Sequence, residues 1–177
     1  MSSHRIKAGQ TQRRKVIDKA RQIQLIVFYF DGVFTDNRVL VLQDGTEGVF
    51  CCRSDGFGLD AIRLLDIQLL VLSTEKNSVV SARCKKLNLP CIQGCDNKPE
   101  ALKLETQKLG VPLSRVAYMG NDINDLESMK MVGLPVCVSD AYPDIIAASS
   151  YVTNAKGGYG AVREFCDFIA DIKNGNI

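Results

Sequence analysis

The chain of 177 residues has no tryptophan, one histidine and only 7% aromatic residues. It also lacks a long apolar run, because Asp66 and Gln68 interrupt even the apolar stretch from 64 to 72, whereas a membrane-spanning helix needs ~20 such residues. The N-terminus has no apolar core of the kind found in signal peptides. We therefore expect a cytoplasmic protein with no membrane partner.

A strong surplus of charge is missing too. The formal net charge of +2 is too small to predict a nucleic-acid partner. Most of the local imbalance lies in residues 1–22, which are basic but carry no aromatic side chains between the charges. We expect residues 1–22 to be a solvated or partly helical lead-in or a linker from a preceding domain, and residues 23–177 to form one domain.

The seven cysteines are odd in number and show no C-x-x-C spacing, so neither a disulfide framework nor a zinc finger is predicted. Cys84, Cys91 and Cys95 are the closest approach to a metal-ligand cluster. They have no fourth cysteine at suitable spacing, and the single His4 is far away in the chain. We interpret them as reduced, small hydrophobic residues in or near the core.

The fold class follows from buried strands that alternate with helical patterns. The first strand, at 25–30, consists of six apolar or aromatic residues and ends at Asp31-Gly32. Further strands are predicted at 67–72, 90–92, 116–119, 134–138 and 151–152, and helices at 59–65, 78–87, 99–109, 126–131, 143–148 and 161–172. This alternation predicts an α/β, Rossmann-like fold with a parallel sheet covered by helices on both faces.

One segment breaks the alternation. Two β-prone runs, 39–42 and 49–52, flank Asp44-Gly45, which is a strong hairpin signal. We expect this hairpin to project from the parallel core.

Polar residues mark the carboxyl ends of several predicted strands, where open α/β sheets place their ligands. They are Asp31, Ser73, Thr74, Lys98, Asn121, Asp122 and Asp125. A hydroxyl and a lysine can hold a phosphate, and acidic side chains with a carbonyl can hold Mg²⁺. Each residue also has a simpler interpretation, as a turn or helix cap, a surface lysine or an acid at a helix N-terminus. Their order along the chain favours a phosphate site.

These residues resemble the four motifs of the haloacid dehalogenase superfamily of phosphatases. The motifs correspond to the segment 29–36, to Ser73, to Lys98 and to the segment 120–125. The hairpin, the segment 55–58 and the segment 157–164 are similar to the 3-deoxy-manno-octulosonate 8-phosphate phosphatase branch. That branch includes phosphatases of nine-carbon, sialic-acid-type sugar acids and the C-terminal domain of acylneuraminate cytidylyltransferases.

The resemblance implies a capless enzyme, usually a homotetramer, in which the hairpin of one subunit helps to close the site of a neighbour. It implies that Asp31 is the general acid and base, that Ser73, Thr74 and Lys98 bind phosphate, and that Asp55, Gly58 and Arg163 contact the sugar acid. Mg²⁺ would be held by residues of the first and fourth motifs, here Asp31, Asn121, Asp122 and Asp125.

Two positions depart from the pattern that the resemblance implies. The nucleophilic aspartate is replaced by Tyr29, whose phenol has an ordinary pKa near ~10 and only one oxygen. The usual metal-binding aspartate of the fourth motif is replaced by Asn121, which supplies no charge. We expect Mg²⁺ binding to be weakened, unless Asp122 moves in, and Tyr29 to be a core aromatic residue rather than a nucleophile.

Three functional hypotheses remain open. The first is a phosphatase scaffold for a 2-keto-3-deoxy sugar acid phosphate that has lost most or all hydrolysis and serves assembly or regulation beside a cytidylyltransferase. The second is an active Mg²⁺-dependent phosphatase, which requires that Tyr29 is an introduced substitution or that Asp31 or water makes the attack. The third is a domain that only binds anions through Ser73 and Lys98.

Overall fold

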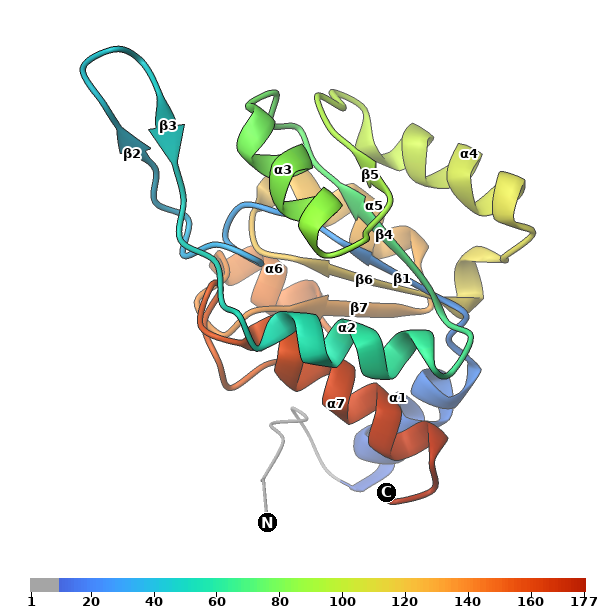
Figure 1. The fold of residues 1–177 in the computed structure, drawn as a ribbon. Helices are drawn as coiled ribbons and strands as arrows, with labels where there is room; N and C mark the ends of the chain where they lie inside the picture. The colour runs from blue at the N-terminus through green and yellow to red at the C-terminus, as the bar shows by residue number, and fades with distance from the viewer. Residues whose placement is uncertain (1–9) are drawn as a thin grey trace.

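A computed structural model describes residues 10–177. Its centre is a six-stranded parallel sheet (Figure 1). In spatial order the strands are β5 (Cys91–Ile92), β4 (Gln68–Leu72), β1 (Leu25–Phe28), β6 (Val116–Gly120), β7 (Leu134–Cys137) and β8 (Tyr151–Val152). The first strand of the sequence therefore lies inside the sheet, as its unbroken apolar run predicts.

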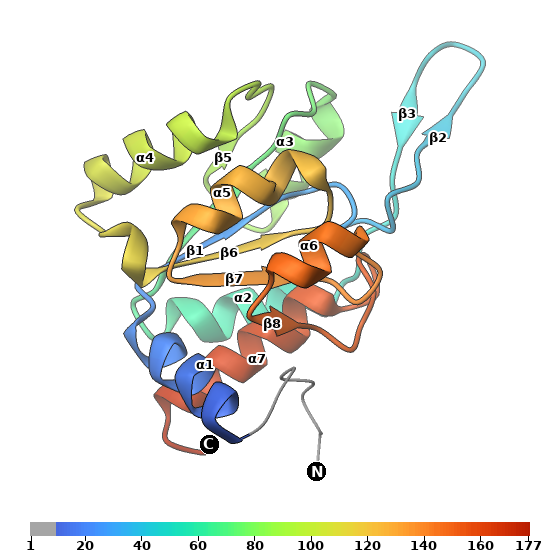
Figure 2. The same cartoon turned by 180° about the vertical axis from the view of Figure 1, so that it is seen from behind.

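Helices cover both faces of the sheet, which confirms the predicted fold class (Figures 1 and 2). On one face α2 and α7 pack against each other, and α4, α5 and α6 lie on the other. The helices are α1 (Gln10–Gln22), α2 (Asp55–Arg63), α3 (Ser78–Lys86), α4 (Lys98–Leu109), α5 (Leu126–Met131), α6 (Pro143–Ala148) and α7 (Ala161–Lys173). Within residues 10–177, none is long and apolar enough to cross a bilayer.

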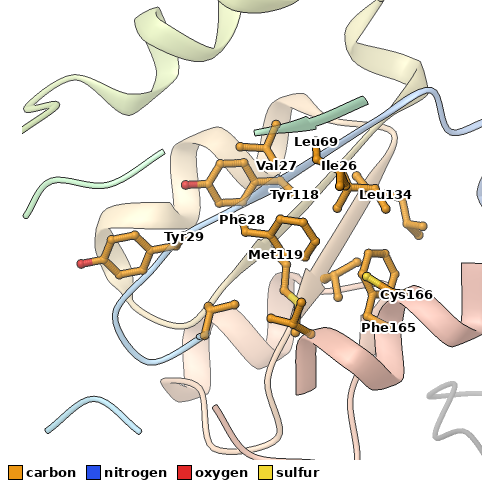
Figure 3. Close-up of a cluster of buried hydrophobic side chains, with 14 of the residues drawn as sticks. Ile26, Val27, Phe28, Tyr29, Leu69, Tyr118, Met119, Leu134, Phe165 and Cys166 are labelled. Atoms are coloured by element: carbon orange, nitrogen blue, oxygen red, sulfur yellow. The ribbon is translucent and has the colours of Figure 1, made fainter. Parts of the chain in front are cut away.

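The core forms where apolar faces of the helices meet the sheet. All four residues of β1 are completely buried and pair with β4 on one side and β6 on the other. The ring of Phe28 lies 5.4 Å from that of Phe34, and Tyr151 stacks on Phe168 of α7 at 4.5 Å. Figure 3 shows the part of this core that joins β1 and β6 to Phe165 and Cys166 of α7.

The first strand ends two residues earlier than predicted. Tyr29 still donates its backbone N–H to Met119, at 2.9 Å, but Val33 and Phe34 donate theirs back to Phe30 and form a turn. The local turn therefore replaces the sheet pairing beyond Tyr29. As a result Asp31 lies in a loop beyond the sheet edge.

The predicted hairpin is present but shorter. Only β2 (Leu40–Val41) and β3 (Glu47–Gly48) pair, and they project from the body of the molecule (Figure 1). Side chains from Val39 to Leu42 are about half exposed. The strands lack a packed face, and this limits the length of regular pairing.

The basic segment expected as a lead-in is helical from Gln10 and packs on the domain. Val16 and Ala20 of α1 are buried, and α1 lies against α7. Lys173 of α7 donates to the carbonyl of Ile23, at 2.9 Å. Residues 10–22 therefore share the core of the domain, whereas residues 1–9, with His4, lie outside the described residues.

Candidate active site at the carboxyl edge of the sheet

A buried ion pair lies where β6 ends and α4 begins. Lys98, at the first position of α4, is 1% exposed, and its Nζ lies 2.6 Å from Oδ1 of Asp125, which is completely buried. Tyr118 donates its hydroxyl to the same oxygen at 2.9 Å, and the backbone N–H of Asn121 donates to Oδ2 at 2.9 Å. These bonds compensate for the loss of water around Asp125.

Tyr29 covers this ion pair. Nζ of Lys98 lies 3.4 Å from the centroid of the Tyr29 ring, which is a cation–π contact. The hydroxyl of Tyr29 lies 3.4 Å from Oγ1 of Thr74. Figure 3 shows Tyr29 and Tyr118 leaving neighbouring strands with their hydroxyls pointing the same way. Burial, above all, raises the pKa of the Tyr29 phenol, so this hydroxyl stays protonated at neutral pH.

Asp31 lies beside this cluster in a different environment. It is half-buried, and burial together with the nearby Glu75 raises its pKa to about 6, against a smaller opposing effect of Lys98. Glu47 of the hairpin acts in the same direction. A carboxyl group with this pKa can exchange a proton near neutral pH, as a general acid or base requires.

Asn121 packs against the turn that carries Asp31. A Cβ added to Gly32, where φ is +76°, would lie 2.0 Å from Nδ2 of Asn121, so this position requires glycine. Asn121 is 6% exposed, and its Oδ1 is buried without a hydrogen-bond partner. A buried amide oxygen in this state is available to a ligand.

Ser73 follows β4 and is fully buried. Its Oγ accepts a hydrogen bond from the backbone N–H of Glu75 at 3.1 Å, which shapes the loop after the strand. Ser73 and Thr74 thus lie at the same edge as Asp31, Lys98 and Asn121. The sequence motifs predicted this convergence from the order of the elements alone.

Asp122 is partly exposed and caps the turn that follows β6. Its Oδ1 accepts from the backbone N–H of Ile123 at 2.7 Å, as part of a capping box with Asp125. It caps the short 3₁₀ turn before α5. The simpler interpretation of this residue therefore accounts for its contacts.

The residues expected around the sugar acid lie elsewhere, at the junction of α2 and α7. Asp55 is completely buried and accepts from the backbone N–H of Arg163, while the Arg163 guanidinium pairs with Asp167 at 2.7 Å. A Cβ on Gly58 would lie 2.9 Å from Cβ of Cys166, so this glycine allows the two helices to approach. In this chain the three residues join α2 to α7.

A cleft of about 270 Å³ opens beside Tyr29 and Asp31. Its other walls include Arg38, Glu47, Glu75 and Asn77. Asn77 caps α3 through its Oδ1 and donates its Nδ2 to Glu47 at 2.8 Å, which fastens the hairpin to the loop after β4. Sequence reasoning missed these four residues, although Glu75 directly follows Ser73-Thr74 and could have been found there.

Comparison with known proteins agrees with this geometry. The haloacid dehalogenase-like hydrolase family matches residues 72–165. The chain is 37% identical to the 3-deoxy-D-manno-octulosonate 8-phosphate phosphatase KdsC of Escherichia coli K12, over 87% of this chain and 82% of the relative. It belongs to the haloacid dehalogenase-like hydrolases, in the KdsC branch.

Solved structures of related proteins superpose closely. The 3-deoxy-D-manno-octulosonate 8-phosphate phosphatase of Moraxella catarrhalis, in complex with magnesium ion, phosphate ion and KDO, has a TM-score of 0.88 and 34% identity, covering 92% of this chain and 94% of that one. A putative family hydrolase from Streptomyces avermitilis has a TM-score of 0.82 and 44% identity, covering 88% and 87%.

The metal expected in this branch finds few ligands here. Asp31 offers one carboxylate and Asn121 one neutral oxygen, whereas both oxygens of Asp125 already accept hydrogen bonds. In the part of the chain that the structure describes, no three His, Cys, Asp or Glu side chains are grouped as a metal would need. This includes Cys84, Cys91 and Cys95, which are free thiols. The donor set is therefore poor in charge for Mg²⁺.

Proposed function

We propose that this chain is a KdsC-like protein that keeps the phosphatase fold for a 2-keto-3-deoxy sugar acid phosphate, of octulosonate or nonulosonate type, but does not hydrolyse the ester. The observation that carries the proposal is the stacking of Tyr29 on Lys98. Lys98, which the resemblance predicts to bind phosphate, is thereby buried, paired with Asp125 and covered by an aromatic ring.

The chemistry of Tyr29 supports the same conclusion. A neutral phenol is a weak nucleophile, and burial raises the pKa of this one further. Its ring also fills space between Lys98 and Thr74, so a phosphate group that reached Lys98 would have to displace it. Asp31 keeps a pKa suited to proton transfer but has no nucleophile beside it to serve.

A role in assembly or regulation, beside an acylneuraminate cytidylyltransferase, is the matching biological proposal. The exposed apolar hairpin, with Leu40 and Val41 more than half exposed, supports an assembly role. A homotetramer and a cytoplasmic location belong to the same proposal. The Asp55, Gly58 and Arg163 contacts to a sugar acid remain predictions from the resemblance.

The test is release of inorganic phosphate from 3-deoxy-D-manno-octulosonate 8-phosphate and from a nonulosonate 9-phosphate in millimolar Mg²⁺. We expect the wild-type protein to stay at the level of the blank and the double variant Tyr29→Asp/Asn121→Asp to exceed it by ~10³-fold or more, because a covalent nucleophile is restored, a carboxylate is added for Mg²⁺ and Lys98 is uncovered. Tyr29→Phe is the matched control, since it keeps the ring and should stay silent.

Robust Mg²⁺-dependent turnover by the wild-type protein would overturn the proposal. Size-exclusion chromatography with light scattering tests the assembly part separately, where a monomer would argue against it.

A further inference from the structure

The site lacks the charge that a divalent cation requires. The candidate metal ligands with acidic side chains are Asp31, Asp122 and Asp125, and the nearby Glu75 accepts from the backbone N–H groups of Lys76 and Asn77. Asp125 is neutralised by Lys98 at 2.6 Å, and Asp122 caps the following turn. Of these three carboxylates, Asp31 alone neither pairs with Lys98 at ion-pair distance nor caps a turn.

Asn121 is the residue that decides the balance. The residue is 6% exposed, and its Oδ1 lies at the turn of Asp31-Gly32, buried and without a hydrogen-bond partner. The position therefore has the unpartnered oxygen of a metal ligand but not the negative charge. Mg²⁺ loses its water reluctantly, and neutral oxygens compensate for that loss poorly.

The site already contains a positively charged group. The ammonium group of Lys98 is held between Asp125 and the face of the Tyr29 ring. Since Tyr29 is neutral, its position adds no negative charge to offset the repulsion between this ammonium group and a divalent ion.

We infer that this chain does not retain Mg²⁺ at the carboxyl edge of its sheet. Asn121 is a cause of this loss independent of Tyr29, and Lys98 is the resident cation of the site. The inference rests on the proposed function in that both place Tyr29 where the family has its nucleophile. It separates two changes that act on different ligands, because Tyr29 excludes phosphate and Asn121 withholds charge from the metal.

The test uses Mn²⁺ as a paramagnetic probe, with free Mn²⁺ measured by electron paramagnetic resonance during titration into the full chain. We expect no saturable binding by the wild-type protein in the range up to about millimolar. Asn121→Asp should bind at least about tenfold more tightly, because it adds a carboxylate where the orphan oxygen lies. Gln107→Glu, near the far end of α4, adds the same charge away from the site and should behave as wild type.

Phosphate release distinguishes this inference from the proposed function. Asn121→Asp should bind Mn²⁺ in competition with Mg²⁺ and still release no phosphate, because Tyr29 continues to cover Lys98. Saturable sub-millimolar binding by the wild-type protein would overturn the inference and leave the proposed function standing. Equal binding by Asn121→Asp, Gln107→Glu and wild type would overturn the role of Asn121. Circular dichroism of each variant verifies folding.

Discussion

Two carboxylates are completely buried within residues 10–177, and their surroundings differ. Asp125, at the sheet edge, accepts from Lys98, Tyr118 and the backbone N–H of Asn121. Asp55, at the junction of α2 and α7, accepts from one backbone N–H at 3.2 Å, and its Oδ2 has no partner. Burial therefore does not by itself make a functional acid, because the partners decide what the charge costs.

The contrast also shows that, within this one chain, a buried charge can support the fold without taking part in catalysis. The Asp125 network is complete although Tyr29 stands where the resemblance predicts a nucleophile. A fully bonded ion pair supports the fold whether or not phosphate binds. The Asp55 centre is incomplete, and burial raises the pKa of Asp55 to about 6 despite the Arg163 hydrogen bond.

The largest effect should come from removing one partner of the Asp125 network. Lys98→Ala leaves a buried carboxylate without its cation, and we expect the free energy of unfolding to fall by about 3–5 kcal/mol, as measured by urea denaturation. Lys130→Ala removes an exposed pair with Glu127 and should cost less than about 1 kcal/mol. Equal losses in the two variants would contradict the role given to the buried pair.

The next effect is a pH dependence that belongs to Asp55. A pKa of about 6 in the folded state lies above the ordinary value of 3.8, so the folded chain binds this proton more tightly than the unfolded chain. The resulting stabilisation is complete below pH ~4 and is lost as the pH rises through ~6.

Asp55→Asn isolates this effect. The difference in unfolding free energy between wild type and Asp55→Asn should change by on the order of 2–3 kcal/mol between pH 4 and 7, with wild type favoured at the acidic end. Urea denaturation at a series of pH values measures it. A difference that stays constant with pH would show that Asp55 keeps an ordinary pKa.

The smallest effect sharpens the comparison inside the Asp125 network. Tyr118→Phe removes one of the hydrogen bonds to Asp125 but leaves Lys98 in place. We expect the free energy of unfolding to fall by about 1–2 kcal/mol in thermal or urea denaturation, because the hydroxyl donates to a charged carboxylate. A loss as large as that of Lys98→Ala would mean that the hydroxyl, and not the ammonium, balances the carboxylate.

Much of the fold was predictable because it depends on local pattern. The apolar runs before Asp31 and before Ser73 are long enough to be buried strands, and their alternation with helices leaves a parallel sheet as the consistent arrangement. The boundaries of α5, α6 and β8 match the prediction residue for residue. The hairpin was placed correctly but was predicted too long, since its outer residues find no packed face.

The site was predicted only in part. The motif order brought Asp31, Ser73, Lys98 and Asn121 to one edge, because parallel strands end together. It did not reveal that Glu47 and Glu75 share a cleft with Asp31, because that depends on the direction in which the hairpin projects from the domain.

The sequence by itself determined the family and the sheet, and it placed a phenol and an amide at two positions where the resemblance predicts aspartates. Only the tertiary structure decided what those substitutions do. Tyr29 is a buried residue of the core, and packing places its ring 3.4 Å from the ammonium of Lys98, while the amide oxygen of Asn121 is left unpaired beside Gly32. Such contacts join residues about 70–90 positions apart, and no local pattern encodes which of them a side chain will choose.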